Sequence, residues 1–351
     1  MATSNHSEPK PSKQTANRAL RVVRIIHQLD KLAIPVEFLR ALTTVGIPYL
    51  NIAFLGLVLN QLQQHATFRP VILLIGGFLL ARYLLQLASN WFAKLAEDHE
   101  TGVNRRLDRA TTEKLLTVSY TTLQDPDMRN QYAGAVEGKT FSGGITSLMK
   151  DGLQDFFSLV IAIGFAVATL INLTQATNHA ATWFNDARYP LLIIALLLFP
   201  IIVGGWSVHH NNQIQQKLIR KILPNNRRFT YFSNFTQNMD NHQVIRLYQA
   251  SALVMKNERD SMYHFMDQLR LGYWEIAKFG HWPNVAIALS VIGLYILVGA
   301  KALMGVLAIG SVMIAVGYFQ QLMTTAYEFL QEVGGYITVS YTHLTLPTIR
   351  L

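Results

Sequence analysis

Residues 240–248, with the sequence DNHQVIRLY, lie near the middle of a polar segment that extends over residues 211–278. Strongly apolar runs flank this segment on both sides. A polar insert of this length either builds a separate domain or extends the two flanking helices. At ~1.5 Å rise per residue, half of the insert forms a helix of roughly 45–50 Å. We therefore expect two helical arms whose tip lies near residues 244–248.

The composition indicates a membrane protein. Of the 351 residues, 50% are hydrophobic and only 15% are charged, whereas a soluble domain carries about 25% charged residues. The formal net charge of +9 is typical of chains that bind nucleic acid or a membrane surface. Because the basic residues alternate with apolar runs, membrane topology explains them and nucleic acid is not an expected partner. The absence of cysteine excludes disulfides, thiolate metal sites and a cysteine nucleophile.

Six apolar runs are compared with the ~20 residues that cross a bilayer as a helix. They cover residues 41–62, 70–93, 155–172, 189–207, 282–300 and 302–330. The predicted fold class is an all-α membrane protein with six transmembrane helices and two long helical cytoplasmic extensions. Only residues 299–301 separate the last two runs, so these two helices are expected to form an antiparallel hairpin.

The connections between the runs alternate in length, and the long ones carry most of the basic residues. The short connections hold only Arg69, Arg188 and Lys301. Because basic residues are retained on the cytoplasmic side, the long connections and both termini are predicted to be cytoplasmic.

The N-terminal region divides into two parts. Residues 1–19 are polar and are expected to be disordered. Residues 19–40 alternate apolar and basic side chains at helical spacing, which predicts an amphipathic helix at the membrane interface; a plain basic flank is the alternative. Glu37 and Arg40 are interpreted as the polar flank of the first span.

Both long connections have mixed apolar and charged helical faces, over residues 107–118 and 214–232. A break is predicted at residues 121–127, because Pro126 disfavours helix at the residue before it. We expect each connection to form two helical arms closed by a short transverse helix.

This layout resembles the transmembrane domain of exporter-type ABC transporters. Residues 240–258, with VIRLY inside them, are similar to the second coupling-helix region of that family, and LQDPDMRNQYA (123–133) is similar to the segment before the first. GVLAIGSV (305–312), followed by YFQQL (318–322), is similar to the start of the sixth span. The resemblance covers about residues 20–335 and is loose at each motif; residues 20–338 are predicted to form one six-helix domain.

The resemblance implies that a second transmembrane half, a homo- or heterodimer partner, encloses a cavity with this one. It also implies ATP-binding domains that hold ATP and Mg and contact the coupling segments. The implied contact residues are Asp127, Met128, Asn130, Tyr132, Val244, Ile245, Arg246, Leu247 and Tyr248.

No nucleotide site is predicted in this chain. AGAVEGKT (133–140) and FSGGI (141–145) superficially match a phosphate loop and a signature loop. Both are rejected because no apolar strand precedes the first match and because the second directly abuts it. No catalytic, cofactor-binding or metal-ligating residue is assigned. Residues 339–351 are interpreted as a non-native, adapter-derived tail, so the ATP-hydrolysing domain is expected to be missing; a genuine polar tail is the alternative.

Three polar residues inside the apolar runs are candidate working residues. Arg82 costs ~2.5–3.5 kcal/mol in a span and either lines a cavity or pairs with a neighbouring helix. Asn51 and Asn284 are candidate interhelical contacts or cavity-lining groups.

The predicted function is the permease part of an ATP-driven exporter in a bacterial plasma membrane, with a peptide, a lipid or a hydrophobic small molecule as cargo. Two alternatives stay open: a six-span channel or secondary permease without an ATPase, and a membrane-anchored regulatory protein.

Overall fold

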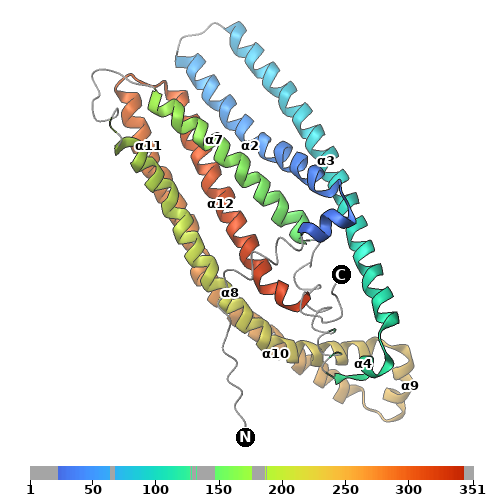
Figure 1. Ribbon diagram of the computed structural model, residues 1–351. Coiled ribbons are helices and arrows are strands. Elements are labelled where there is room, and N and C mark those ends of the chain that lie inside the picture. The colour runs from blue at the N-terminus through green and yellow to red at the C-terminus, as the bar shows by residue number, and fades with distance from the viewer. Residues whose placement is uncertain are drawn as a thin grey trace. The chain divides into compact units, whose positions relative to one another are not determined.

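The computed structural model describes residues 23–63, 68–126, 128, 132, 147–175, 186 and 188–343. Two predictions lie outside the described residues. They are the disordered segment at residues 1–19 and the rejected phosphate-loop and signature-loop matches at residues 133–145. Within the described residues the chain is helical and contains no strand (Figure 1), which confirms the all-α prediction. The chain divides into two compact units, residues 1–201 with 287–351, and residues 202–286.

Each apolar run predicted from the sequence lies mainly in one long helix. These helices are α2 (Ala33–Gln63), α3 (Phe68–Thr117), α7 (Gln154–Gln175), α8 (Arg188–Gln237), α11 (Trp282–Leu303) and α12 (Ile309–His343). The helices extend beyond several runs, because charged residues can continue a helix after the apolar side chains end.

Five helical stretches among the described residues are long and apolar enough to cross a membrane. They are Ala33–Gln63, Phe68–Thr117, Met149–Gln175, Arg188–Leu218 and Ser251–Leu303. α12 is not among the five, and Gln320, Gln321 and Glu328 make it more polar. The sixth span therefore stays a prediction.

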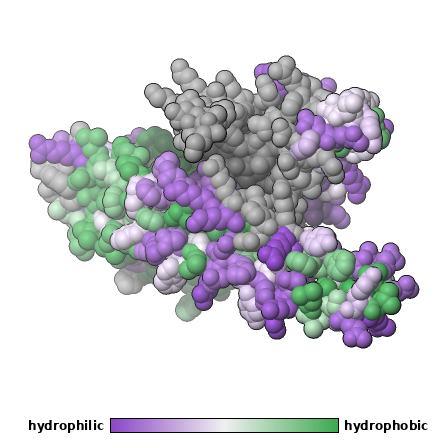
Figure 2. All heavy atoms as spheres, turned by 90° about the horizontal axis from the view of Figure 1, so that it is seen from below, coloured by the Kyte–Doolittle hydropathy of each residue, from purple (hydrophilic) through white to green (hydrophobic). Residues whose placement is uncertain are grey.

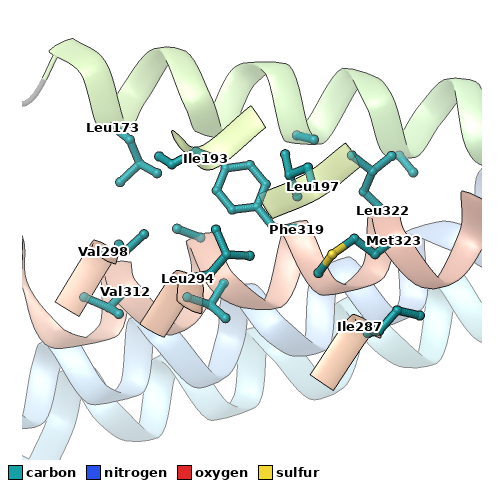
Figure 3. Packing of buried hydrophobic residues seen from close by; sticks show 14 of the residues in the cluster. Leu173, Ile193, Leu197, Ile287, Leu294, Val298, Val312, Phe319, Leu322 and Met323 are labelled. Carbon is teal, nitrogen blue, oxygen red and sulfur yellow. The ribbon is translucent and has the colours of Figure 1, made fainter. Parts of the chain in front are cut away.

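The first unit has an apolar core in which α12 packs against α2 and α7. Phe319 of α12 is fully buried in this core, which also contains Leu197 of α8 and Leu294 of α11. Figure 3 shows these side chains pointing toward one another from their different helices. The apolar residues of this core are therefore explained by burial against other helices, including the more polar α12.

Two glycines lie where α2 and α12 approach each other closely. A Cβ atom added to Gly310 of α12 would lie 1.9 Å from the backbone oxygen of Gly56 in α2. Gln63 closes the same end, because its Oε1 accepts a hydrogen bond from Ile309 N at 3.2 Å. Small residues of this kind let membrane helices pack backbone to backbone.

Many other apolar side chains are exposed at the surface. In the apolar window of α3 no residue is buried, and Leu73, Leu80 and Tyr83 are all more than half exposed. Figure 2 likewise shows hydrophobic residues at the surface among hydrophilic ones. Exposed apolar area of this extent marks a contact with lipid or with another protein.

The position predicted for the chain reversal, residues 299–301, is wrong, because the reversal lies about one helical turn farther along the chain. α11 continues to Leu303, and the chain reverses before Ile309, where Gly305 has a φ of +73°. Lys301 explains the shift, because its side chain is fully buried. Its Nζ donates a hydrogen bond to the carbonyl of Leu173 in α7 and lies 4.8 Å from the centre of the Tyr189 ring in α8.

Lys301 is expected to join the ends of three helices, so Lys301→Ala should destabilise the bundle by ~2–5 kcal/mol, the usual cost of truncating a large buried side chain. Lys301→Met keeps the packed stem and should lose roughly 1.5–3 kcal/mol, the range for a hydrogen bond from a charged donor. Thermal unfolding of the detergent-solubilised variants measures both losses. Wild-type stability of Lys301→Met would show that the ammonium group contributes nothing.

The N-terminal helix is interrupted where the sequence predicted continuity over residues 19–40. Residues 23–29 are helical, and the helix stops at Asp30, whose Oδ1 accepts from Leu32 N at 3.0 Å. Ile26 packs with Val103 of α3 and Met149 of η1 (Leu148–Leu153), so one face is buried against protein. Asp30 also lies 2.8 Å from His99 Nδ1 of α3. Partial burial works to raise the pKa of Asp30, but the contacts with His99 and the Leu32 amide lower it below its usual value.

The break predicted at residues 121–127 is shifted as well. α3 ends at Thr117, and the short helix α4 (Tyr120–Gln124) follows. Ser119 starts α4 because its side chain accepts from Thr122 N. α4 ends immediately before Asp125, the residue that precedes Pro126, as expected from the clash of the proline ring with the preceding residue.

The second unit is an antiparallel helical hairpin of α8 and α10 (Ser251–Gly280). The paired contacts are Ser207 with Phe279, Leu218 with Gly272, Phe229 with Phe265, and Thr236 with Glu258. Residue numbers rise along α8 as they fall along α10, which is the signature of antiparallel packing. The two helical arms predicted around residues 240–248 are therefore present.

Candidate functional site

The tip of the α8–α10 hairpin is formed by the short helix α9 (Met239–Leu247). α8 ends at Gln237, and Asn238 caps α9, because its side chain accepts from Asp240 N at 3.0 Å. This is the usual N-terminal cap of a helix. Asn238 N still donates to Asn234 O at 3.1 Å, so the chain changes direction within one or two residues.

Side chains of α9 anchor it to the last turn of α8. Asn241 Nδ2 donates to Phe235 O at 3.1 Å. His242 Nε2 lies 2.7 Å from Thr236 O, and because a carbonyl can only accept, this nitrogen donates. Thr236 also donates from Oγ1 to Glu258 Oε2 of α10 at 3.4 Å. The tip is thus connected to both arms, which favours its moving together with them.

The exit from α9 is fixed by backbone geometry. Tyr248 N donates to Val244 O at 3.1 Å and Ala250 N donates to Ile245 O at 2.9 Å. Between them Gln249 has a φ of +50°, an uncommon conformation for a residue other than glycine. The chain then enters α10 at Ser251.

The predicted contact residues of α9 are displayed at the surface of this chain. No residue of α9 is buried. Leu247 and Tyr248 are 77% and 75% exposed. Val244 and Arg246 are also exposed, and Ile245 is half-buried. Exposed apolar side chains thus lie beside one cation, on a helix that has no buried residue. Such a surface is suited to binding another protein.

The first predicted contact segment is only partly described. Met128 is buried and Tyr132 is exposed. Asp127 and Asn130 lie outside the described residues.

The three polar candidates inside the apolar runs lie in different surroundings. Arg82 is exposed on α3. Asn51 of α2 is half-buried, and its Oδ1 has no hydrogen-bond partner among the described residues. Asn284 is exposed and belongs to the second unit. The structure brings none of these residues together into a site.

A buried charge cluster was not predicted from the sequence. Glu37, interpreted above as an interfacial flank, is fully buried. Arg40 Nη1 lies 3.0 Å from Glu100 Oε1 of α3 and 3.5 Å from Glu37 Oε2. The i, i+3 spacing of Glu37 and Arg40 could have suggested the pair, but nothing local indicates that Glu100 joins it.

No protein-family model and no curated protein matches this chain. The all-helical fold and the apolar helices are those of a membrane protein, and the further assignment depends on the hairpin and its tip.

Proposed function

We propose that this chain is the transmembrane half of an ATP-driven exporter that moves its cargo by alternating access. The observation that carries the proposal is the capped helix α9 at the tip of a long helical hairpin, where Val244, Arg246 and Leu247, and Tyr248 directly after the helix, are exposed.

The apolar helices support the membrane part of the proposal. α8 and α11 each contribute residues both to the apolar core and to the hairpin unit. A lever needs such continuity, because a force applied at one end must be transmitted along the helices to the spans. Motions of this kind are rigid-body shifts of packed helices between two arrangements.

The hairpin tip supports the proposed partner. An ATP-binding domain that holds ATP and Mg would receive α9 in a groove, with Leu247 and Tyr248 as buried anchors. Large apolar and aromatic side chains together with arginine dominate binding energy at such interfaces. To invert the two conformations almost completely, ATP must favour one of them by ~5.5 kcal/mol.

The remaining assignments complete the proposal. The partner half is a second copy of this chain or a related chain, and the first predicted contact segment, around Met128 and Tyr132, also contacts the ATP-binding domain. The location is a bacterial plasma membrane, with the hairpin on the cytoplasmic side, and the cargo is a peptide, a lipid or a hydrophobic small molecule.

Reading the genomic DNA beyond codon 338 to the natural stop tests the assignment. An open frame that encodes a phosphate loop preceded by an apolar strand, with a signature loop farther downstream, supports it. A stop codon shortly after codon 338, with no separate ATP-binding chain encoded beside it, contradicts it.

The role of the tip is tested in the full-length protein by Tyr248→Ala. Losing an anchor side chain costs ~2 kcal/mol or more, which corresponds to roughly a thirtyfold weaker contact. Transport per ATP hydrolysed should therefore fall steeply while membrane insertion stays normal, and Arg246→Ala should act in the same direction. Tyr263→Ala is the matched control, because Tyr263 is also exposed but lies on α10. Equal coupling in the Tyr248 and Tyr263 variants would place the contact elsewhere.

A further inference from the structure

The cluster of Glu37, Arg40 and Glu100 contains more negative than positive groups. Glu37 is 0% and Glu100 is 5% exposed, so water solvates neither carboxyl group appreciably. Arg40 is the one cation in direct ion-pair contact with them among the described residues. With both acids ionised, the cluster would hold an uncompensated buried charge, which is strongly unfavourable.

The contacts indicate how this excess charge is removed. Both carboxyl groups contact the same guanidinium group, since Arg40 Nη1 lies 3.0 Å from Glu100 Oε1 and 3.5 Å from Glu37 Oε2. One guanidinium group cannot compensate two buried carboxylates, so one of the two acids is expected to carry a proton. Glu37 Oε1 has no hydrogen-bond partner among the described residues, so one oxygen of this buried acid is free to hold the proton.

Other ionisable groups around the cluster do not replace this proton. Lys150 of η1 acts on Glu100 through its charge, but it is exposed. His99, the neighbour of Glu100 on α3, is paired with Asp30 at 2.8 Å. The cluster therefore joins α2 and α3, with η1 beside them, through two acids and a single guanidinium group.

We propose that Glu37, Glu100 and Arg40 form a proton-binding site that holds the start of α2 against α3, and that release of the proton loosens this junction. At low pH one of the two acids carries the proton and the junction is closed. As the pH rises, the proton leaves to solvent and two buried carboxylates share one guanidinium group. The stability that the site contributes is therefore present at low pH and lost as the pH increases.

Infrared spectroscopy of the purified chain in lipid nanodiscs detects the proton directly through the carbonyl stretch of a protonated carboxylic acid. The wild-type chain should show a component of this band that disappears as the pH is raised from mildly acidic to mildly alkaline. Glu37→Gln and Glu100→Gln should each lack that component. Glu113→Gln should keep it, because Glu113 is an exposed carboxylate on the same helix. An unchanged band in both cluster variants would overturn the proposal.

Cysteine labelling measures the loosening, since the chain contains no cysteine of its own. Ala96 is fully buried one turn before Glu100, and Leu116 is 81% exposed on the same helix. The labelling rate of Ala96→Cys, divided by that of Leu116→Cys to remove the effect of pH on thiol reactivity, should rise severalfold with pH. In the Glu37→Gln background the ratio should stay flat.

Two further outcomes would overturn the proposal even if a variant does not fold. The first is a wild-type labelling ratio that is independent of pH. The second is a pH profile that shifts when sodium is replaced by choline, because the site would then bind a metal cation and not a proton.

Discussion

Gly310→Ala will destabilise the helix bundle, although alanine is the better helix former. The added Cβ would lie 1.9 Å from Gly56 O and 2.5 Å from Asn60 Oδ1. The first of these atoms belongs to the backbone, so α2 and α12 must separate instead of a side chain rotating away. Overpacking of this kind costs ~1–3 kcal/mol or more. The free energy of unfolding in detergent should fall by at least the upper part of that range.

Gly299→Ala on α11 is the matched control for this prediction. A Cβ at Gly299 meets no atom within 4 Å. In this helix interior the alanine should therefore be neutral, or should stabilise by ~0.5–1 kcal/mol through reduced backbone entropy. The two substitutions are chemically identical, so opposite signs would isolate the helix contact as the cause. Similar effects at both positions would mean that α2 and α12 do not approach this closely.

Arg40→Met should be the most damaging single change in the charge cluster. It removes the guanidinium group that lies 3.0 Å from Glu100 and 3.5 Å from Glu37. Removing one partner from a buried ion pair costs ~3–5 kcal/mol, because the remaining charge stays buried without compensation. The loss should be smaller at acidic pH, where protonation neutralises the two acids. Thermal unfolding in detergent at several pH values measures it.

An exposed ion pair on α3 provides the comparison for Arg40. Arg109 Nε lies 2.8 Å from Glu113 Oε1, but the side chains are 81% and 63% exposed. Such i, i+4 pairs contribute only ~0.3–0.5 kcal/mol, so Arg109→Met should be nearly neutral. Adding Glu37→Gln to Arg40→Met should restore part of the lost stability, since one buried acid is then removed. Strictly additive effects of the two substitutions would argue against direct coupling.

The sequence alone determined which segments are helical and apolar. Hydropathy and helical spacing are properties of neighbouring residues, and each run from 41–62 to 302–330 therefore lies mainly in one helix. The arms and the short helix at the tip were also predictable. The length of the insert limits the possibilities, and Asn238 and Gln249 set the ends of α9 through local backbone chemistry.

The tertiary structure alone decided which polar residues are buried. Glu37 and Glu100 are far apart in the sequence. They share one guanidinium group only because α2 and α3 pack together at these residues. Lys301 could be assigned to a turn by spacing, but contacts with Leu173 and Tyr189 keep it inside the bundle. Gly310 likewise shows no local sign of its contact with Gly56. Burial depends on contacts between helices distant in the chain, and no pattern of neighbouring residues encodes those contacts.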